Sequence, residues 1–202
     1  MKKLTVSTQA LLVQIGYVLA YPMLKLMSPK CPAKKLNGEF HIAVQGFLNG
    51  YSKENVRFLL NQASLESGLQ WQNNATTQDN NPFGMGRVRT RPTTQVGARV
   101  ANDGSIVTNS VNYIGTYTNI ALGVADRFLW DSYAKIDGRS NQYVDAVIQQ
   151  GYNPNPQQYQ WNWLNTQSIG LTIAKIHTAI FGMLLAGFTV TTLMLNKKKR
   201  SR

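Results

Sequence analysis

The stretch SKENVRFLLNQASLESG, residues 52–68, decides the fold of the central part of this chain. Ser52 is a typical N-cap residue, and Glu54 places a negative charge in the first turn, where it suits the helix dipole. Gly68 supplies the left-handed residue with which many helices end. We therefore predict a helix from Lys53 to Ser67.

The apolar residues of this helix lie on one face. They recur at helical spacing: Val56, Leu59, Leu60 and Ala63. Glu66 continues the same stripe, so we expect its carboxyl group at the inner edge of the helix end. Desolvation and the dipole both oppose ionisation there, which is how a glycosidase prepares a general acid. The periodicity alone also fits an interfacial glutamate paired with Lys or Arg.

The residues that follow this helix are polar but almost uncharged. Residues 71–86 read WQNNATTQDNNPFGMG, a stretch rich in amides, hydroxyls and aromatic rings. Such groups hydrogen-bond sugar hydroxyls and N-acetyl groups, while Trp71 and Phe83 offer flat apolar faces. By itself, the stretch also fits a plain polar loop.

The charge of the chain is strongly positive but unevenly distributed. Lys and Arg number 21 against nine Asp and Glu, a net charge of +12. The excess is +4 over residues 1–30, +2 over residues 31–166 and +6 over residues 167–202. A nucleic-acid-binding domain would carry its basic residues on the folded body, so we expect no nucleic acid partner. Basic ends beside hydrophobic segments indicate a lipid membrane instead.

The content of cysteine and histidine limits metal and disulfide chemistry. Cys31 is the single cysteine, and His41 and His177 are the two histidines. No disulfide within the chain and no cysteine-based zinc site can form, and two distant histidines argue against another metal site. We expect neither a metal nor an organic cofactor.

The C-terminal part predicts a transmembrane helix over residues 169–195. Its last twenty residues, 176–195, carry no formal charge apart from His177, and about twenty residues suffice to cross a bilayer core. The basic tail, residues 196–202, belongs in the cytoplasm by the positive-inside rule, which places the central domain on the extracytoplasmic side. Small residues at positions 182 and 186 would let two such helices approach and form a homo-oligomer, or are merely small residues in a membrane helix.

The N-terminal part is a hydrophobic segment over residues 1–29. Its apolar run, residues 10–23, is short for a membrane span, so it is a signal anchor, a cleaved signal peptide, or an interfacial or core helix. Residues 29–37, PKCPAKKLN, contain two prolines and few apolar side chains, and we predict a linker over residues 30–39. A short apolar helix follows over residues 40–50.

Two motifs of the central region together resemble a known family. Residues 63–68, ASLESG, followed by residues 80–85, NNPFGM, resemble the "ALESG … NNPFG" signature of bacterial and phage endo-β-N-acetylglucosaminidases. These enzymes belong to the lysozyme-like superfamily of peptidoglycan hydrolases. Weaker similarities follow in residues 111–119, 125–130 and 143–159. The resemblance implies an α+β, mainly helical, lysozyme-like domain over residues 40–166, with a small β-hairpin insertion.

The resemblance also implies roles for individual residues. Glu66 corresponds to the general acid of the family. Asn81, Phe83 and Gly84 would shape the cleft around the cleaved sugar and bind it, and Tyr117 would be an active-site tyrosine. From its chemistry, Trp71 is a further candidate for sugar binding.

The second carboxylate that the family often has on the hairpin is replaced here. Gln95 stands where an acid is expected, which makes it a candidate for substrate binding, and the next carboxylate is Asp103 in a predicted turn. Asp103 could act as the base of an inverting hydrolase, which needs its two carboxyl groups about 6.5–9.5 Å apart. Alternatively, the N-acetyl group of the substrate assists, or Glu66 acts first as acid and then as base, as in a lytic transglycosylase.

Four arginines follow the NNPFG motif within residues 87–99. Their alternation with apolar or hydroxyl residues over residues 87–91 predicts a strand with one basic face. Such a face would hold anionic wall polymers, or it is a solvated edge that resists aggregation.

These observations lead to one expected function and two alternatives. We expect a membrane-anchored enzyme of a phage virion or a bacterial envelope that cleaves peptidoglycan glycan strands, as a glucosaminidase, muramidase or lytic transglycosylase. The first alternative is a non-catalytic glycan-binding module that retains the cleft. The second is a structural or pore-forming membrane protein.

Overall fold

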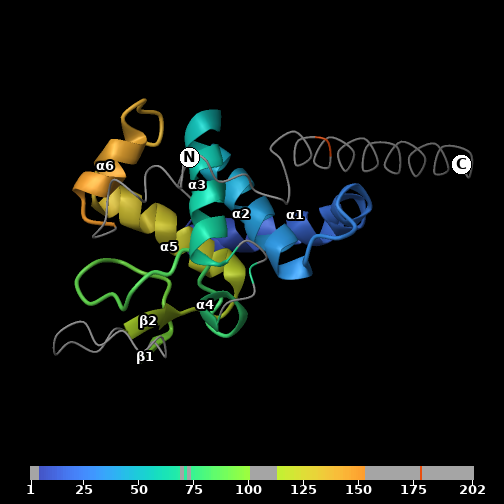
Figure 1. Ribbon diagram of the computed structural model, residues 1–202, viewed down its shortest axis with the longest axis horizontal. Helices are drawn as coiled ribbons and strands as arrows, with labels where there is room; N and C mark the ends of the chain where they lie inside the picture. Colours follow the sequence, from blue (N-terminus) through green and yellow to red (C-terminus); the bar gives the residue numbers. More distant parts are fainter. Residues whose placement is uncertain (1–4, 69–70, 72–73, 101–112, 153–177, 179–202) are drawn as a thin grey trace, which may run out of the picture.

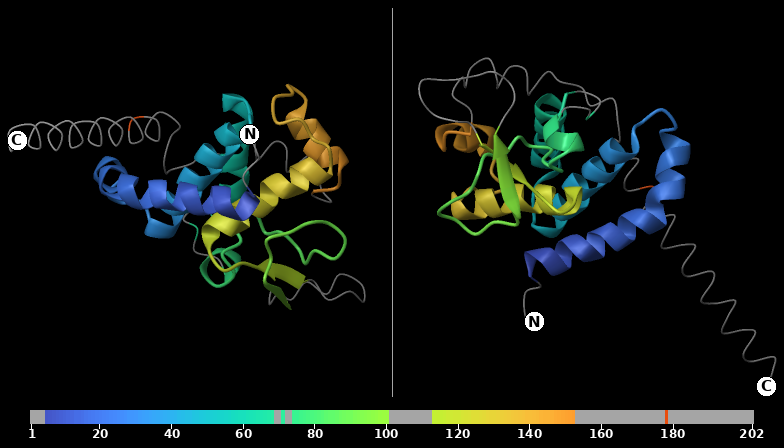
Figure 2. Two further views of the ribbon diagram at one scale, coloured as in Figure 1. Left: turned by 180° about the vertical axis from the view of Figure 1, so that it is seen from behind. Right: turned by 90° about the horizontal axis from the view of Figure 1, so that it is seen from below.

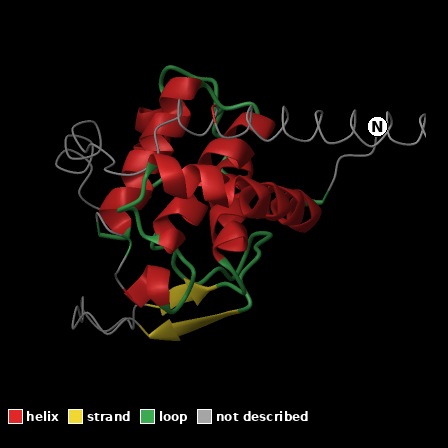
Figure 3. Ribbon diagram, turned by 90° about the vertical axis from the view of Figure 1, so that its right-hand side faces the viewer, coloured by secondary structure: helices red, strands yellow, loops and turns green. Residues whose placement is uncertain are grey.

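The computed structural model describes residues 5–68, 71, 74–100, 113–152 and 178. This part of the chain is mainly helical, with a two-stranded sheet at one edge (Figure 1, Figure 3). The elements in chain order are α1 (Val6–Met27), α2 (Ala33–Leu48), α3 (Lys53–Glu66), α4 (Asn74–Thr77), β1 (Gly97–Val100), β2 (Tyr113–Thr116), α5 (Ile120–Tyr133) and α6 (Tyr143–Gln149).

Helix α3 confirms the signals at both of its ends. The backbone N–H of Asn55 donates to the Ser52 side chain at 3.2 Å, so Ser52 is the N-cap. Gly68 adopts a φ of +64° just beyond the last turn. The four residues of the predicted apolar stripe are all buried: Val56, Leu59, Leu60 and Ala63.

The hydrophobic core lies between the longer helices. Helix α2 packs against α1, α3 and α5, while the shorter α6 packs against α3. Gly46 of α2 permits this close approach, because a Cβ atom there would lie 2.8 Å from Val56 of α3. Leu36, Ile42, Leu59 and Val124 are completely buried in the centre.

The predicted linker over residues 30–39 is wrong for most of its length. Helix α2 begins at Ala33, directly after Pro32, which occupies the N-cap position. Proline is well tolerated at the start of a helix, so it marks a helix boundary here and not an extended connection. Lys35 and Glu39 are buried on the inner side of α2 with an ion pair of 3.7 Å. The prolines and the low apolar content made the segment resemble an exposed linker.

Helix α1 contributes one of its faces to the core. Its buried residues are Ala10, Val13, Tyr17, Ala20 and Leu24, and it lies along α2 and α5 (Figure 2). The Tyr17 hydroxyl donates to the Ala33 carbonyl at 3.2 Å. Among the described residues, α1 is the one helix long and apolar enough to cross a membrane. The predicted C-terminal span, 169–195, lies outside the described residues except for the helical Thr178, as does the tail 196–202.

The predicted β-hairpin insertion is present as strands β1 and β2. They pair antiparallel, with Gly97 opposite Thr116 and Val100 opposite Tyr113. The connection between them, residues 101–112, lies outside the described residues.

The predicted basic strand over residues 87–91 is instead a loop. Next to β2 it forms an isolated bridge between Gly86 and Ile114 and a hydrogen bond from the Arg87 N–H to the Tyr113 carbonyl, but no continuous ladder. Two further contacts of this loop involve side chains. The N–H of Val88 donates to the Gln95 side chain, and the Arg91 side chain forms an ion pair with Asp126 of α5. A two-residue alternation therefore did not indicate a strand in this segment.

Candidate active site

The turn over residues 80–85 is fastened to the end of α3. Asn80 and Gly84 adopt left-handed φ angles of +54° and +60°. The Ser67 hydroxyl, just after α3, donates to the Pro82 carbonyl at 2.7 Å. This bond brings the turn against the last residue of the helix, Glu66.

Asn81 holds the same turn together from inside. Its Nδ2 donates to the carbonyls of Met85 and Gly115 at 2.8 and 3.0 Å, and its Oδ1 accepts from the Met85 N–H at 2.9 Å. The side chain is buried, and it is not among the residues that line the cavity described below. The structure therefore places Asn81 behind the turn as a positioning residue, and not at the surface where a sugar would bind.

Glu66 occupies the position expected from the α3 stripe. It is only partly exposed, and its Oε2 would lie 3.1 Å from a Cβ atom at position 84, so only a glycine fits comfortably against this carboxyl group. Burial raises the pKa of Glu66 to about 7. At neutral pH a large fraction of the protein molecules therefore carries a proton on the Glu66 carboxyl group.

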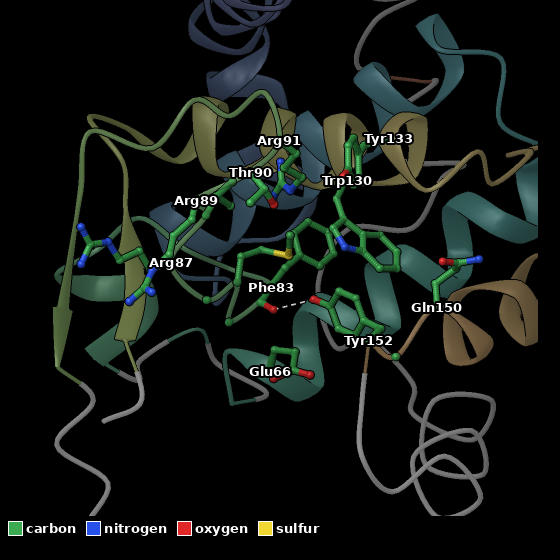
Figure 4. Close-up of a pocket in the computed structure, with 15 residues that line it drawn as sticks. Glu66, Phe83, Arg87, Arg89, Thr90, Arg91, Trp130, Tyr133, Gln150 and Tyr152 are labelled. Atoms are coloured by element: carbon green, nitrogen blue, oxygen red, sulfur yellow. Dashed lines mark hydrogen bonds between the residues drawn. The ribbon is translucent and has the colours of Figure 1, made fainter. Parts of the chain in front are cut away.

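A cavity of about 490 Å³ opens beside Glu66 (Figure 4). This volume falls within the usual range of ligand sites, about 300–1,000 Å³. Among the described residues that line the cavity, Glu66 is the one with a carboxyl group. The lining consists of Glu66, Phe83, Gly84, Met85, Gly86, Arg87, Val88, Arg89, Thr90, Arg91, Trp130, Tyr133, Gln150, Gly151 and Tyr152.

Aromatic side chains form one wall of the cavity. The Tyr152 hydroxyl donates to the Phe83 carbonyl at 2.6 Å, and the rings of Trp130 and Tyr152 meet edge to face with centroids 5.3 Å apart (Figure 4). Behind them, the buried Arg127 guanidinium lies 4.7 Å from the Trp130 ring centroid and pairs with Asp131. Rings held in this way can stack on the apolar face of a sugar without losing further entropy.

The loop on the other side of the cavity is anchored by Asp126 of α5. This buried carboxylate forms a bidentate ion pair with Arg91, with N···O distances of 3.1 and 2.8 Å. It also accepts from the Thr93 hydroxyl at 2.7 Å and the Thr94 N–H at 3.2 Å. The Tyr117 hydroxyl completes the set at 2.8 Å. We call these residues, Arg91, Thr93, Thr94, Tyr117 and Asp126, the Asp126 cluster.

Tyr117 and Gln95 lie in or next to this cluster and not on the cavity. Tyr117 is buried, and burial together with the Asp126 charge raises the pKa of its hydroxyl well above the ordinary value. Gln95 donates to the Gly86 carbonyl and to the Tyr117 hydroxyl at 2.8 and 3.1 Å and accepts from the Val88 N–H at 3.0 Å. The structure therefore assigns Tyr117 and Gln95 to positioning the loop.

Trp71 is not a platform for sugars in this structure. Its ring is 1% exposed and lies against Gly38 of α2, where a Cβ atom would be 1.9 Å from the indole. The cavity uses Trp130 instead, which lies near the end of α5. The candidate base Asp103 lies outside the described residues.

Of the predicted site residues, Glu66, Phe83 and Gly84 line the cavity together. Neither Trp130 nor Tyr152 was among the predicted site residues. A weak signal existed for both, because residues 125–130 and 143–159 belong to the segments with family resemblance. Tyr152 in fact does both: it packs against the core and faces the cavity.

The described residues contain no group of three or more His, Cys, Asp or Glu side chains that could hold a metal ion. What the cavity offers is one protonatable carboxyl group, an aromatic wall and a loop that carries arginines. Comparison with protein-family models, with curated proteins and with solved structures finds no match to this chain.

Proposed function

We propose that this protein cleaves the glycan strand of peptidoglycan, with Glu66 as the general acid. The observation that carries the proposal is the carboxyl group of Glu66, whose pKa is raised by burial to about 7 and which lines a cavity together with aromatic side chains. The resemblance of residues 63–68 and 80–85 to the glucosaminidases supports the same conclusion, as does the helical domain with a small hairpin. We assign the domain to the lysozyme-like superfamily on these grounds.

The chemistry begins with the proton on Glu66. The protonated carboxyl group donates it to the leaving glycosidic oxygen while the bond to the anomeric carbon breaks and an oxocarbenium-like centre develops. The carboxylate formed then accepts a proton from the incoming nucleophile, which is either water or a hydroxyl group of the same sugar. A pKa near the working pH suits both roles, because the group must give and take a proton within one cycle.

A mechanism with one carboxylate fits the described residues best. Glu66 is the one acid among the described cavity residues, and the amide of Gln95 is committed to backbone and tyrosine partners. We therefore favour the lytic transglycosylase route, or assistance by the substrate's N-acetyl group, over a two-carboxylate inverting mechanism. Mass spectrometry distinguishes the products, since the transglycosylase route yields anhydro sugars and hydrolysis yields reducing ends.

The test compares two glutamates of the same helix. The full-length chain is incubated with purified sacculi, and the release of muropeptides is followed for the wild type, Glu66→Gln and Glu54→Gln. Glu54 is exposed in the first turn of α3 and serves as the matched control. We expect Glu66→Gln to lose about 10²–10⁴-fold in rate, while Glu54→Gln retains the wild-type rate. Equal release by Glu66→Gln and the wild type would refute the assignment.

A second candidate function is a glycan-binding module without catalysis. It is favoured by the absence of a second carboxylate among the described cavity residues. In this case the wild type would sediment with sacculi but release nothing, and Glu66→Gln would bind equally well.

The proposed location is a membrane with the domain on its extracytoplasmic side. The apolar segment 169–195 and the basic tail 196–202 support an anchor whose C-terminal end is cytoplasmic. Such a location would bring the cavity to the wall of a bacterium, either from its own envelope or from a phage virion membrane.

A further inference from the structure

The outer face of α1 is apolar along most of its length. Every exposed position between residues 11 and 26 carries an apolar side chain: Leu11, Leu12, Ile15, Val18, Leu19, Pro22, Met23 and Leu26. The large side chains among them are 40–77% exposed. At about 100° per residue these positions cover an arc of roughly 140° on one side of the helix. A continuous apolar surface of this kind marks an interaction site.

The opposite face of α1 is committed to the domain. Val13, Tyr17 and Leu24 belong to the hydrophobic core. A chain of polar side chains reinforces this packing: Gln14 bonds to His41 at 2.9 Å, and His41 bonds to Gln45 at 2.9 Å. A helix that crossed a bilayer would have to give up these contacts or carry the polar domain into the lipid, which is costly. The outer face must therefore be covered while the inner face stays in place.

The charge around α1 indicates which surface covers it. Residues 1–30 contain four lysines and no carboxylate, whereas Lys35 further along the chain is buried and paired with Glu39. Lys30 is exposed just beyond the end of α1, and Lys25 lies in its last turn. Apolar side chains next to a local excess of lysines over carboxylates are the pattern of a helix at an anionic lipid surface. There the apolar side chains enter the acyl boundary and the ammonium groups meet phosphates.

We propose that α1 is an in-plane membrane-docking helix. Its outer face, Leu11 to Leu26, lies in the boundary layer of an anionic bilayer while its inner face remains part of the domain core. In Figure 2, α5 lies between α1 and α6. A bilayer against α1 therefore leaves the α6 side, where Gln150 and Tyr152 line the cavity, facing away from the lipid.

The experiment measures the depth of single positions on α1 in the full-length protein. Cys31 is the one native cysteine, so Cys31→Ser provides the background. Leu11→Cys, Leu19→Cys and Leu26→Cys are each spin-labelled, with Val96→Cys as the matched control, because Val96 is a 68% exposed apolar residue far from α1 in the sequence. The protein is reconstituted into vesicles of three parts phosphatidylcholine and one part phosphatidylglycerol.

The expected result is one shallow depth for all three labels on α1. Each should be accessible to lipid-borne oxygen and protected from an aqueous nickel complex, while Val96→Cys shows the reverse. Circular dichroism confirms that each labelled variant is folded, and Ile15→Cys and Val18→Cys replace any that is not. An anchor elsewhere in the chain would not produce this pattern, because the labels report only on α1.

Three other results would overturn the proposal. If the labels on α1 were as accessible to the nickel complex as the label on Val96→Cys, the outer face of α1 would lie in water. A depth that is greatest at Leu19→Cys and small at both ends would show a helix that crosses the bilayer. Protection from both oxygen and nickel would mean that protein covers the face, either a second copy of the chain or its own segment 169–195.

Discussion

The cavity beside Glu66 and the Asp126 cluster each bury a carboxyl group, but the two surroundings differ. Asp126 receives five hydrogen bonds, two of them from the Arg91 guanidinium, and its charge is balanced in place. Glu66 lies against Gly84 at the edge of a cavity, where burial raises its pKa to about 7. The difference teaches that burial alone does not fix the protonation state of a carboxyl group. The Arg91 guanidinium compensates the negative charge of Asp126, whereas burial favours the protonated form of Glu66.

The largest expected effect on stability comes from removing the charge at Asp126. Asp126→Asn leaves the Arg91 side chain, 5% exposed, without its counter-charge, and breaking such a buried pair costs about 3–5 kcal/mol of unfolding free energy. Chemical denaturation measures this loss. Asp79→Asn is the control, because its partner Arg99 is 24% exposed. Asp79 itself is 3% exposed, but water reaches the Arg99 guanidinium, so we expect a smaller loss than at Asp126. Equal losses at the two sites would contradict the view that the cluster is a buried anchor.

The next effect is a pH dependence at Glu66. The pKa of Glu66 is about 7 in the folded protein, against the ordinary value of 4.5 that applies to the unfolded chain. Between these two pH values the folded protein therefore binds more protons than the unfolded chain. Its stability therefore decreases as the pH rises through that window. Glu66→Gln removes this loss, so at pH 8 the variant should be more stable than the wild type by up to about 3 kcal/mol.

The same denaturation curves at pH 4 provide the test of that sign. Both states of the wild type are then largely neutral at Glu66, and the advantage of the variant should disappear. Glu54→Gln, at an exposed site of the same helix, should show no such change between pH 4 and pH 8. An advantage of equal size at both pH values would point to packing and not to the proton.

A smaller loss of stability is expected when a methyl group is added at position 84, beside the Glu66 carboxyl group. Gly84→Ala forces a left-handed φ of +60° on alanine and brings its Cβ to 3.1 Å from Glu66 Oε2. The backbone strain costs about 1–2 kcal/mol. Gly68→Ala is the matched control, since its φ is +64° but its Cβ would meet nothing within 4 Å. We expect both variants to lose similar stability and only Gly84→Ala to lose activity on sacculi. Equal activity of the two would exclude a tight fit at Glu66.

The smallest effect separates positioning from catalysis at Tyr117. Tyr117→Phe removes one of the five hydrogen bonds to Asp126, which should cost about 1 kcal/mol. Because the hydroxyl does not line the cavity, kcat should change by no more than about twofold, whereas general acid–base participation would be worth about 10²-fold or more. Tyr113→Phe, on the exposed side of β2, is the control and should change neither quantity.

Some of the candidate site could be predicted because its determinants are local. The N-cap, the apolar stripe and the terminal glycine of α3 each act between residues no more than about four positions apart. Together they place Glu66 at the inner end of the helix. The NNPFG segment was identified by its family resemblance, and the structure shows it as a turn with left-handed positions at Asn80 and Gly84.

Other parts could not be predicted because they depend on partners far along the chain. Trp71 and Trp130 are both aromatic residues near polar neighbours in the sequence. The ring of Trp71, however, packs against Gly38 of α2 and does not line the cavity, whereas Trp130 does. Lys35 and Glu39 looked like linker residues until their burial as a pair was known. No local pattern contains these contacts.

By itself the sequence determined the helix that carries Glu66 and the apolar character of both ends of the chain. Only the tertiary structure decided that Tyr117 and Gln95 belong to the Asp126 side, that Trp130 and Tyr152 face the cavity, and that the inner face of α1 is part of the core. The physical reason is range: capping, turn geometry and periodicity operate between neighbours in the chain, while desolvation and packing depend on whichever segments the fold brings together.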